Sequence, residues 1–202
     1  MTKRIAIIAE GATEKVFGSV LREYLGARLA GRMPKLTLIS EDGRTPTGER
    51  LQRDVFRLLD HHDAVIALTD VYTGSHPPDF VDAADAKMKM RAWVGPDARF
   101  HPHAAQYEFE AWLLPYWSRI QKLAGNSRPL PWQNPETVNH GSPPSTVLQE
   151  FFRTGSAKRK YSKTRDCAAI LRDQDLEVSA ARCPELKAFL DTILTISAAA
   201  HA

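Results

Sequence analysis

The sequence is short of the features that mark several large protein classes. It has two cysteines in 202 residues, Cys167 and Cys183, and their spacing is not that of a metal site. No apolar run approaches the length of a membrane-spanning helix, and no signal-peptide pattern precedes the first apolar run. The G-x-G-x-x-G fingerprint and the Walker-type lysine motif are both missing, which excludes the common Gly-rich modes of ATP binding. We therefore expect a cytoplasmic protein with reduced thiols and no membrane partner.

What remains is the composition of an ordinary globular domain. Hydrophobic residues make up 43% of the chain and charged residues 25%, and 202 residues can bury a substantial core. The apolar runs typical of strands cover residues 4–9, 35–40, 64–70 and 99–105, and the amphipathic runs typical of helices cover residues 14–29, 49–61, 79–93 and 108–123. This alternation predicts an α/β fold, with a parallel sheet of about four strands flanked by helices.

The composition changes near residue 125. Residues 126–145 are rich in proline and glycine and have no hydrophobic periodicity, which is typical of a long loop or a boundary. Helical patterns return afterwards, at residues 145–152, 166–172 and 184–197. We predict an α/β domain over residues 1–124, followed by a long loop and a helical C-terminal extension over residues 125–202 that packs on it.

Two apolar runs each end in a carboxylate. Glu10 follows residues 4–9, and Asp70 ends the run that begins at residue 64. Because parallel strands end at one edge of their sheet, where open α/β sheets place ligands, both acids are expected at that edge and suit a divalent metal. Glu14 is a further candidate, although an acid in a first helical turn also stabilises the helix dipole. Asp70 has the alternative role of capping the turn that follows it.

A second acidic pair, Glu108 and Glu110, follows the fourth predicted strand. In an extended conformation the two carboxylates share one face, which would make them a ligand pair. The alternative is that a helix has already begun, in which case they diverge and are acids of its first turn. His101 and His103 are also two residues apart, but without a third ligand nearby a zinc site ranks far below the carboxylates.

Positive charge is concentrated in one segment. Residues 153–165 contain six basic residues and no acidic one, so the rest of a chain of net charge +3 carries −3. This concentration points to a polyanionic partner such as nucleic acid, with Tyr161 available to stack on a base. The alternative is a solvated loop. The basic residues are Arg153, Lys158, Arg159, Lys160, Lys163 and Arg165.

Together these motifs resemble a known domain. Glu10-Gly11-x-Thr13-Glu14 after the first strand, an acid after the third and an acidic pair after the fourth resemble the TOPRIM domain of topoisomerases, primases and OLD nucleases. A TOPRIM-like bacterial family, domain of unknown function 4276, is similar over almost the full length. Seven ordered motifs carry this resemblance: Glu10 to Glu14, Thr69-Asp70-Val71-Tyr72, Tyr107 to Trp112, Pro135-Glu136-x-Val138-Asn139, Pro144-Ser145, Tyr161-x-Lys163 and Cys183-Pro184.

The resemblance implies a Rossmann-like TOPRIM sheet and a set of site residues. OLD-type nucleases would place Mg²⁺ or Mn²⁺ on Glu10, Glu14, Asp70, Glu108 and Glu110. Their catalytic positions map onto Glu10, Asp70, Glu110 and a charge-neutralising lysine, Lys163 or less readily Lys160. Tyr72 stands where such nucleases have a second acid, which puts full two-metal chemistry in question unless Glu108 replaces it.

The function implied is a Mg²⁺-dependent nuclease that hydrolyses DNA or RNA. Its relatives resemble the effectors of bacterial anti-phage defence systems that work with an ABC- or SMC-type ATPase. Two alternatives stay open: a non-catalytic TOPRIM-fold module that binds an ATPase partner or nucleic acid, which Tyr72 favours, and phosphoryl or nucleotidyl transfer at the same site. The sequence does not predict whether the substrate is DNA or RNA, and it does not predict the oligomeric state.

Overall fold

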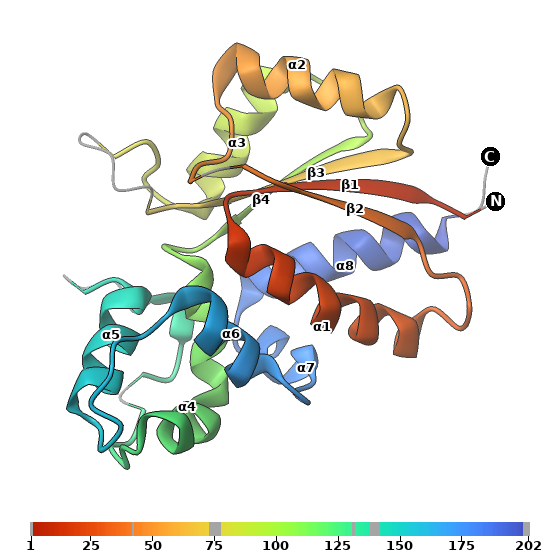
Figure 1. Ribbon diagram of the computed structural model, residues 1–202. Helices are drawn as coiled ribbons and strands as arrows, with labels where there is room; N and C mark the ends of the chain where they lie inside the picture. The colour runs from red at the N-terminus through yellow and green to blue at the C-terminus, as the bar shows by residue number, and fades with distance from the viewer. Residues whose placement is uncertain (1, 42, 73–77, 131, 138–141, 200–202) are drawn as a thin grey trace.

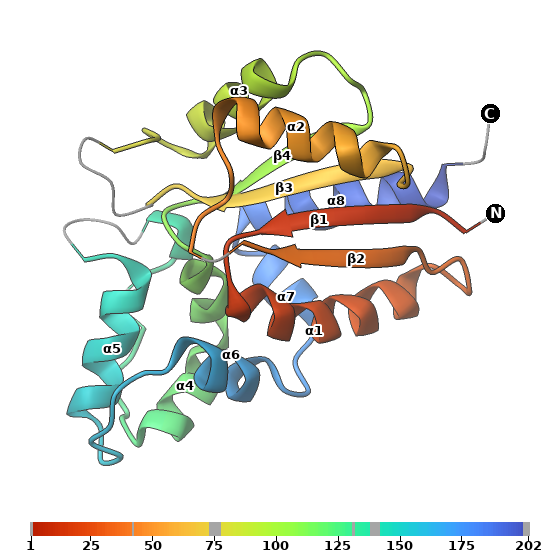
Figure 2. The same ribbon diagram turned by 45° about the horizontal axis from the view of Figure 1, so that its top comes forward.

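Four strands form one parallel sheet in the order β2-β1-β3-β4 (Figure 2). The computed structural model describes residues 2–41, 43–72, 78–130, 132–137 and 142–199, with the backbone alone at residues 12–15. The strands are β1 (Arg4–Ala9), β2 (Lys35–Ser40), β3 (Ala64–Asp70) and β4 (Phe100–Ala105). The first three cover the predicted residues, and β4 begins one residue later than predicted.

Helices cover both faces of the sheet. The helices α2 (Gly48–Leu59) and α3 (Ala83–Val94) lie on one face, and α1 (Ala12–Arg28) and α8 (Pro184–Ala198) lie on the other (Figure 1). Alternate residues of β1 serve the two layers: Ile5 and Ile7 belong to the core on the α1 side, Ala6 and Ile8 to the core on the α2 side. This double burial explains why β1 is a continuous apolar run.

The outer edge of β4 is protected against pairing with another strand. Pro102 lies in the middle of β4 and removes one backbone donor from this edge strand. Lys87 of α3 and Glu185 of α8, from opposite faces of the sheet, form an ion pair with Nζ and Oε2 2.7 Å apart. Charged residues and proline are common devices for blocking an exposed sheet edge.

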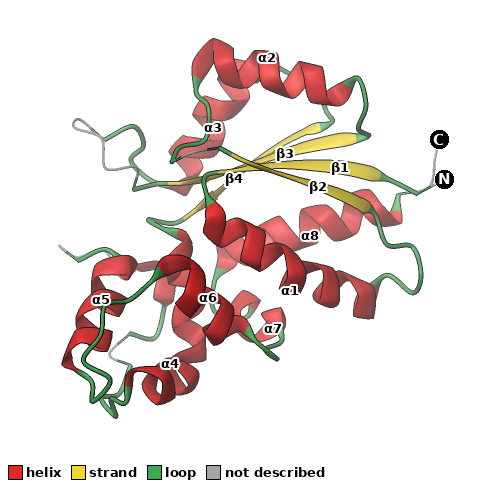
Figure 3. Ribbon diagram, in the orientation of Figure 1, coloured by secondary structure: helices red, strands yellow, loops and turns green. Residues whose placement is uncertain are grey.

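A group of shorter helices lies beyond the carboxyl ends of the strands (Figure 3). It contains a 3₁₀ helix η1 (Phe109–Tyr116), α4 (Trp117–Ala124), η2 (Pro135–Thr137), α5 (Pro144–Thr154), α6 (Lys163–Leu171) and α7 (Leu176–Ala180). One apolar core runs from β1 through these helices to α8, and the division at residue 124 stays a prediction. No helix in the described residues is long and apolar enough to cross a membrane.

The helix expected within residues 108–123 is present as α4, but it occupies only the second half of that stretch. The chain forms a 3₁₀ helix as far as Tyr116 and becomes an α-helix only at Trp117. Pro115 has no N–H to donate, which disfavours a regular α-helix through this segment. Two other differences are smaller: α3 begins at Ala83 rather than at residue 79, and α7 was not predicted.

Candidate acidic site at the carboxyl edge of the sheet

Glu10 lies against the end of the neighbouring strand β3. Its Oε1 accepts hydrogen bonds from Thr69 Oγ1 at 2.8 Å and from the Asp70 backbone N–H at 3.1 Å. The contact follows from the topology, because β1 and β3 are adjacent and parallel, so the residues that end them meet at one edge. The predicted juxtaposition of Glu10 and Asp70 is therefore present in the structure.

Asp70 links the end of β3 to the start of η1. Its Oδ1 accepts a hydrogen bond from the Phe109 N–H at 2.9 Å, the first residue of that helix. A carboxylate at this position satisfies a backbone donor that a helix start leaves without a partner. Asp70 thus caps a helix, as the alternative reading of the sequence allowed, but a helix that begins 39 residues later.

The turn between β4 and η1 has an unusual backbone conformation. Tyr107 has a φ of 71°, in the left-handed region that side chains other than glycine rarely adopt. Its carbonyl accepts a hydrogen bond from the Tyr72 N–H at 2.6 Å. This contact ties the turn to the residues after β3. The turn also sets the positions of Glu108 and Glu110, which follow it in the chain.

Glu108 and Glu110 are not both in an extended segment, so that alternative is wrong. The 3₁₀ helix begins at Phe109, so Glu108 precedes the helix and Glu110 lies in its first turn. Glu108 is buried, and its two carboxylate oxygens accept hydrogen bonds from the backbone N–H and the hydroxyl of Ser145 at 2.8 and 2.9 Å. Ser145 lies in the first turn of α5, so Glu108 holds the start of that helix in place.

Glu110 is buried beside a lysine from a distant segment. Its side chain is 1% exposed, and its Oε1 lies 3.1 Å from Nζ of Lys163, whose side chain is 55% exposed. Burial raises the pKa of Glu110, and the Lys163 charge offsets this only in part. Burial lowers the pKa of Lys163, but the charges of Glu110, Glu108 and Asp70 outweigh it and leave that pKa raised.

Tyr161 completes this cluster. Its hydroxyl is buried and has no hydrogen-bond partner among the described atoms. Burial and the nearby charge of Glu110 raise the pKa of Tyr161, so the hydroxyl stays protonated. We call five residues the acidic edge. They come from the residue after β1, the end of β3, the turn before η1, η1 itself and α6: Glu10, Asp70, Glu108, Glu110 and Lys163.

The acidic edge suits a hydrated Mg²⁺ better than a closed carboxylate cage. No group of three or more His, Cys, Asp or Glu side chains in the described part of the chain is arranged to hold a metal. The side chain of Glu14 lies outside the described residues, and Tyr72 is 46% exposed. Mg²⁺ usually keeps several waters and takes one or two carboxylates, a donor set that Glu10 and Asp70 fit.

The histidine alternative loses support. His103 Nε2 lies 3.0 Å from Thr192 Oγ1 of α8, and its ring packs edge-on against Phe189. Burial, with the Lys87 and His101 charges adding to it, lowers the pKa of His103 to about 4. His103 is a neutral residue in the packing between β4 and α8.

The basic segment carries less free charge than its sequence suggests. Four of its six basic residues form ion pairs: Arg159 and Arg165 with Asp166, Arg153 with Glu150, and Lys163 with Glu110. Within the described residues, only Lys158 and Lys160 of this segment form no ion pair, and both are exposed. The role of residues 153–165 in binding a polyanion stays a prediction; the structure shows that Arg159 and Arg165 also pair with the buried Asp166.

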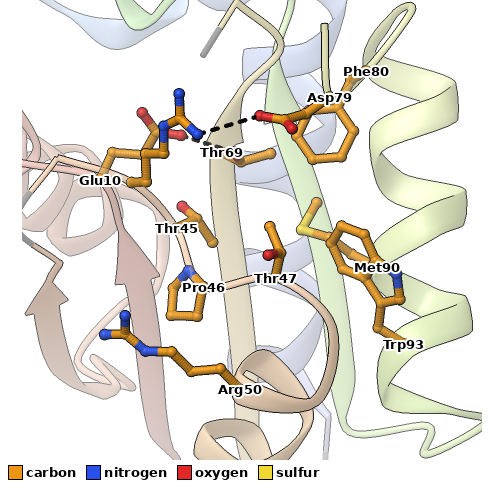
Figure 4. Close-up of a pocket in the computed structure, with 11 residues that line it drawn as sticks. Glu10, Thr45, Pro46, Thr47, Arg50, Thr69, Asp79, Phe80, Met90 and Trp93 are labelled. Carbon is orange, nitrogen blue, oxygen red and sulfur yellow. Dashed lines mark hydrogen bonds and ion pairs between the residues drawn. The ribbon is translucent and has the colours of Figure 1, made fainter. Parts of the chain in front are cut away.

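Sequence analysis missed a cavity on the α2 side of Glu10. It has a volume of about 270 Å³, and Figure 4 shows Glu10 and Thr69 on one side of it and residues of the α2 and α3 segments around the rest. No role was predicted from the sequence for the loop before α2. The signal in the sequence was Arg44-Thr45-Pro46-Thr47, followed by Arg50, which gathers cations and hydroxyls at the start of a helix.

Comparison with known proteins gives the family. The family described as Domain of unknown function (DUF4276) matches residues 9–194, so the chain belongs to it. The structure is similar to the C-terminal region of the Burkholderia pseudomallei OLD protein, at a TM-score of 0.56 and 13% identity, covering 98% of this chain and 100% of that one. The Xanthomonas campestris pv. campestris OLD C-terminal region gives a TM-score of 0.44 at 14% identity, covering 96% and 93%.

These matches settle the fold. They confirm the predicted family and the TOPRIM-like α/β fold of a four-stranded parallel sheet flanked by helices. No curated protein matches the chain significantly.

Proposed function

We propose that this TOPRIM-like member of the DUF4276 family is a nuclease that hydrolyses phosphodiester bonds in DNA or RNA with Mg²⁺ or Mn²⁺. The observation that carries the proposal is the convergence of Glu10, Asp70, Glu110 and Lys163 at one edge of the sheet, from segments far apart in the chain. Acids beside a lysine are the groups that metal-assisted phosphodiester hydrolysis requires.

Glu10 and Asp70 would hold the metal ion, with waters as its remaining ligands and Glu14 as a further candidate that the resemblance supplies. When bound, the ion would activate water and neutralise charge on the phosphate oxygens. Glu10 already reaches β3 through hydrogen bonds at 2.8 and 3.1 Å, so its carboxylate is oriented before any ligand arrives. Such fixed orientation lowers the cost of forming a reactive complex.

Lys163 would neutralise the phosphate as charge develops on it. Its raised pKa keeps the ammonium group charged at neutral pH, and its side chain is 55% exposed, so a ligand can reach it. Glu110 is the positioning residue, because it lies 3.1 Å from Nζ. Lys158 and Lys160, exposed on the loop that leads into α6, would contact the neighbouring backbone phosphates.

The biological role that we propose is that of a cytoplasmic effector in a bacterial anti-phage defence system, working with an ABC- or SMC-type ATPase. The likeness of the fold to the C-terminal region of an OLD protein supports this role.

A second candidate is a module that keeps the fold and binds nucleic acid or an ATPase without cutting. Tyr72 favours it, because an exposed tyrosine stands where OLD-type nucleases have a second acid. Calorimetric titration with Mn²⁺ separates the two: a nuclease site should bind the ion and lose it in Glu10→Gln, whereas a binding module should show no acid-dependent metal site.

The direct test is cleavage of labelled DNA and RNA with Mg²⁺, by wild type, Glu10→Gln and Asp70→Asn. Gln at position 10 can still accept the Thr69 and Asp70 hydrogen bonds, so the change removes charge while keeping the local structure. We expect the rate to fall by about 100-fold or more, the scale seen when groups at a metal site are removed. Glu23→Gln, on an exposed part of α1, is the matched control and should cut normally. Equal cleavage by Glu10→Gln and wild type would refute the proposal.

A further inference from the structure

The cavity beside Glu10 lies between the carboxyl ends of β1 and β3 and the helices α2 and α3. Figure 4 shows Glu10 and Thr45 on one side of it, and Asp79, Phe80 and Trp93 on the other. Because Glu10 belongs both to this cavity and to the acidic edge, and Thr69 of the cavity donates a hydrogen bond to it, a ligand in the cavity would lie next to the proposed site of cleavage. The lining residues are Glu10, Arg44, Thr45, Pro46, Thr47, Arg50, Thr69, Asp79, Phe80, Met90 and Trp93.

One wall of the cavity attracts an anion. Arg50, whose side chain is 61% exposed, lies in the first turn of α2. Thr47 is the N-cap residue of this 12-residue helix, has an extended backbone and makes no side-chain capping hydrogen bond. The first N–H groups of α2 therefore lack the usual side-chain acceptor, and together with a guanidinium they suit a phosphate. Arg50 also pairs with Glu41 through Nη2 at 2.6 Å and lies 3.8 Å from Asp54 through Nε, so the N–H groups of Nη1 are the donors that it keeps for a ligand.

The same wall is fixed in position. The Thr45 hydroxyl is buried and donates a hydrogen bond to the Leu68 carbonyl at 2.9 Å, which ties the loop before α2 to β3. Arg44 lies 3.7 Å from Asp79, which ties the same loop to the segment before α3. The cavity is thus held by contacts on both sides, as expected of a preformed ligand site.

The opposite wall is apolar and aromatic. Phe80 and Trp93 have ring centroids 6.2 Å apart, and Met90 lines the same side of the cavity (Figure 4). A nucleobase stacks readily on aromatic side chains, whatever its sequence. Asp79 at the rim can accept a hydrogen bond from a base amino group or a sugar hydroxyl. Figure 4 places Arg50 and Asp79 at opposite corners, so a phosphate at Arg50 lies away from the Asp79 carboxylate.

We propose that this cavity binds one nucleotide, with its phosphate at Arg50, Thr47 and the start of α2 and its base against Phe80 and Trp93. A volume of about 270 Å³ lies just below the roughly 300–1,000 Å³ of typical small-ligand sites, so the cavity holds one nucleotide at most. The inference rests on the proposed nuclease function and deepens it: the substrate would be a strand with an unpaired nucleotide beside the bond to be cut. A base within a duplex would first have to leave the stack.

The test is calorimetric binding of the four nucleoside 5′-monophosphates, and of the matching nucleosides, to the full chain in EDTA. We expect each nucleotide to bind at least 10-fold more tightly than its nucleoside. Arg50→Gln should weaken nucleotide binding by at least 10-fold. Arg53→Gln, on the same helix but outside the cavity, should weaken it less than twofold. Arg50 is a surface residue, so a thermal melt should show that the variant folds.

A competition experiment identifies the source of the nucleotide. Displacement of the nucleotide by a single-stranded oligonucleotide, but not by a blunt duplex, supports a strand substrate. Displacement by neither supports a free nucleotide as the ligand. The proposal is overturned if no nucleotide binds at millimolar concentration, or if Arg50→Gln binds as well as wild type. Because EDTA removes the metal, these results stand independently of whether the protein cuts nucleic acid.

Discussion

Two carboxylates in this molecule are equally inaccessible to solvent and behave in opposite ways. Asp166 and Glu110 are each 1% exposed. Asp166 accepts hydrogen bonds from Arg159 at 2.8 Å, from Arg165 at 3.1 Å and from the Ser162 N–H at 2.7 Å. Burial raises the pKa of Asp166, but these partners outweigh it and leave the pKa below its usual value.

Glu110 is as inaccessible to solvent as Asp166, but it lies deeper in the protein and has fewer partners. Its ion pair is with Lys163, a half-exposed residue, and burial prevails, so the pKa of Glu110 is raised. The comparison teaches that depth of burial and the number of hydrogen-bond partners together decide whether a carboxylate is stable as an anion. A fully satisfied carboxylate such as Asp166 supports the fold, whereas an incompletely satisfied one in a cluster of charges marks a candidate functional site.

The largest expected effect is a loss of stability on mutating Asp166, the acid with the larger number of hydrogen-bond partners. Asp166→Asn removes the partner of two arginines and weakens the start of α6. Breaking a buried ion pair commonly costs 3–5 kcal/mol; because both arginines are partly exposed, we expect a loss of about 2–3 kcal/mol in the free energy of unfolding. Urea denaturation measures it, with the exposed Asp60→Asn as control. A loss no larger than that of the control would contradict the role given to Asp166.

His103 gives a second case, in which burial lowers a pKa. With a folded-state pKa of about 4, below the value of 6.5 in the unfolded chain, the folded state binds fewer protons between these two values. Stability is therefore fully present above pH 6.5 and falls as the pH drops to 4, by up to about 3 kcal/mol from this group. Urea denaturation of His103→Gln across this range should show a flatter curve than wild type, with the exposed His61→Gln as control. Parallel curves for His103→Gln and wild type would show that His103 is not buried in neutral form.

Glu110→Gln should separate stability from activity. Because the folded-state pKa of Glu110 is raised, the folded state binds more protons than the unfolded chain above pH 4.5, and stability falls as the pH rises through that window. The variant lacks this loss, so at pH 8 it should be as stable as wild type or more so, by up to about 1 kcal/mol.

The same variant should lose cleavage, since Lys163 loses the residue that positions it. Asp166→Asn offers no such separation, because it weakens the fold itself. If Glu110→Gln were strongly destabilised at pH 8, the distinction between the two acids would be lost.

The smallest effect concerns the Tyr161 hydroxyl. Since it has no partner among the described atoms, Tyr161→Phe should change the free energy of unfolding by less than about 0.5 kcal/mol. Tyr116→Phe is the matched control: the Tyr116 hydroxyl donates to the Asp175 carbonyl at 2.9 Å, so its removal should cost about 1 kcal/mol. Equal losses in both variants would mean that Tyr161 has a partner.

The sheet and the meeting of Glu10 with Asp70 could be predicted from the sequence. Both follow from local rules, because a run such as Ile5 to Ala9 is buried on both faces and parallel strands end together. Lys163 was reached only through resemblance to a family, since nothing local indicates that it lies beside Glu110.

The remaining features depend on contacts between distant segments. The 3₁₀ start of the helix after β4 depends on Asp70 and Ser145, which hold Phe109 and Glu108 from elsewhere in the chain. The charges of residues 153–165 do not by themselves predict the ion pair between Arg159 and Asp166, because a count of charges does not show which side chains meet. The cavity needs the loop before α2 and the segment before α3 to meet, and no local pattern predicts that meeting.

Tyr107 links the acidic edge to the end of β3. A left-handed tyrosine costs about 1–2 kcal/mol relative to an ordinary conformation. Contacts on both sides hold it there: the Tyr72 N–H donates a hydrogen bond to the Tyr107 carbonyl, and Asp70 accepts one from the Phe109 N–H. Glu108 lies between these two anchors, so its position depends on the residues at and just after the end of β3.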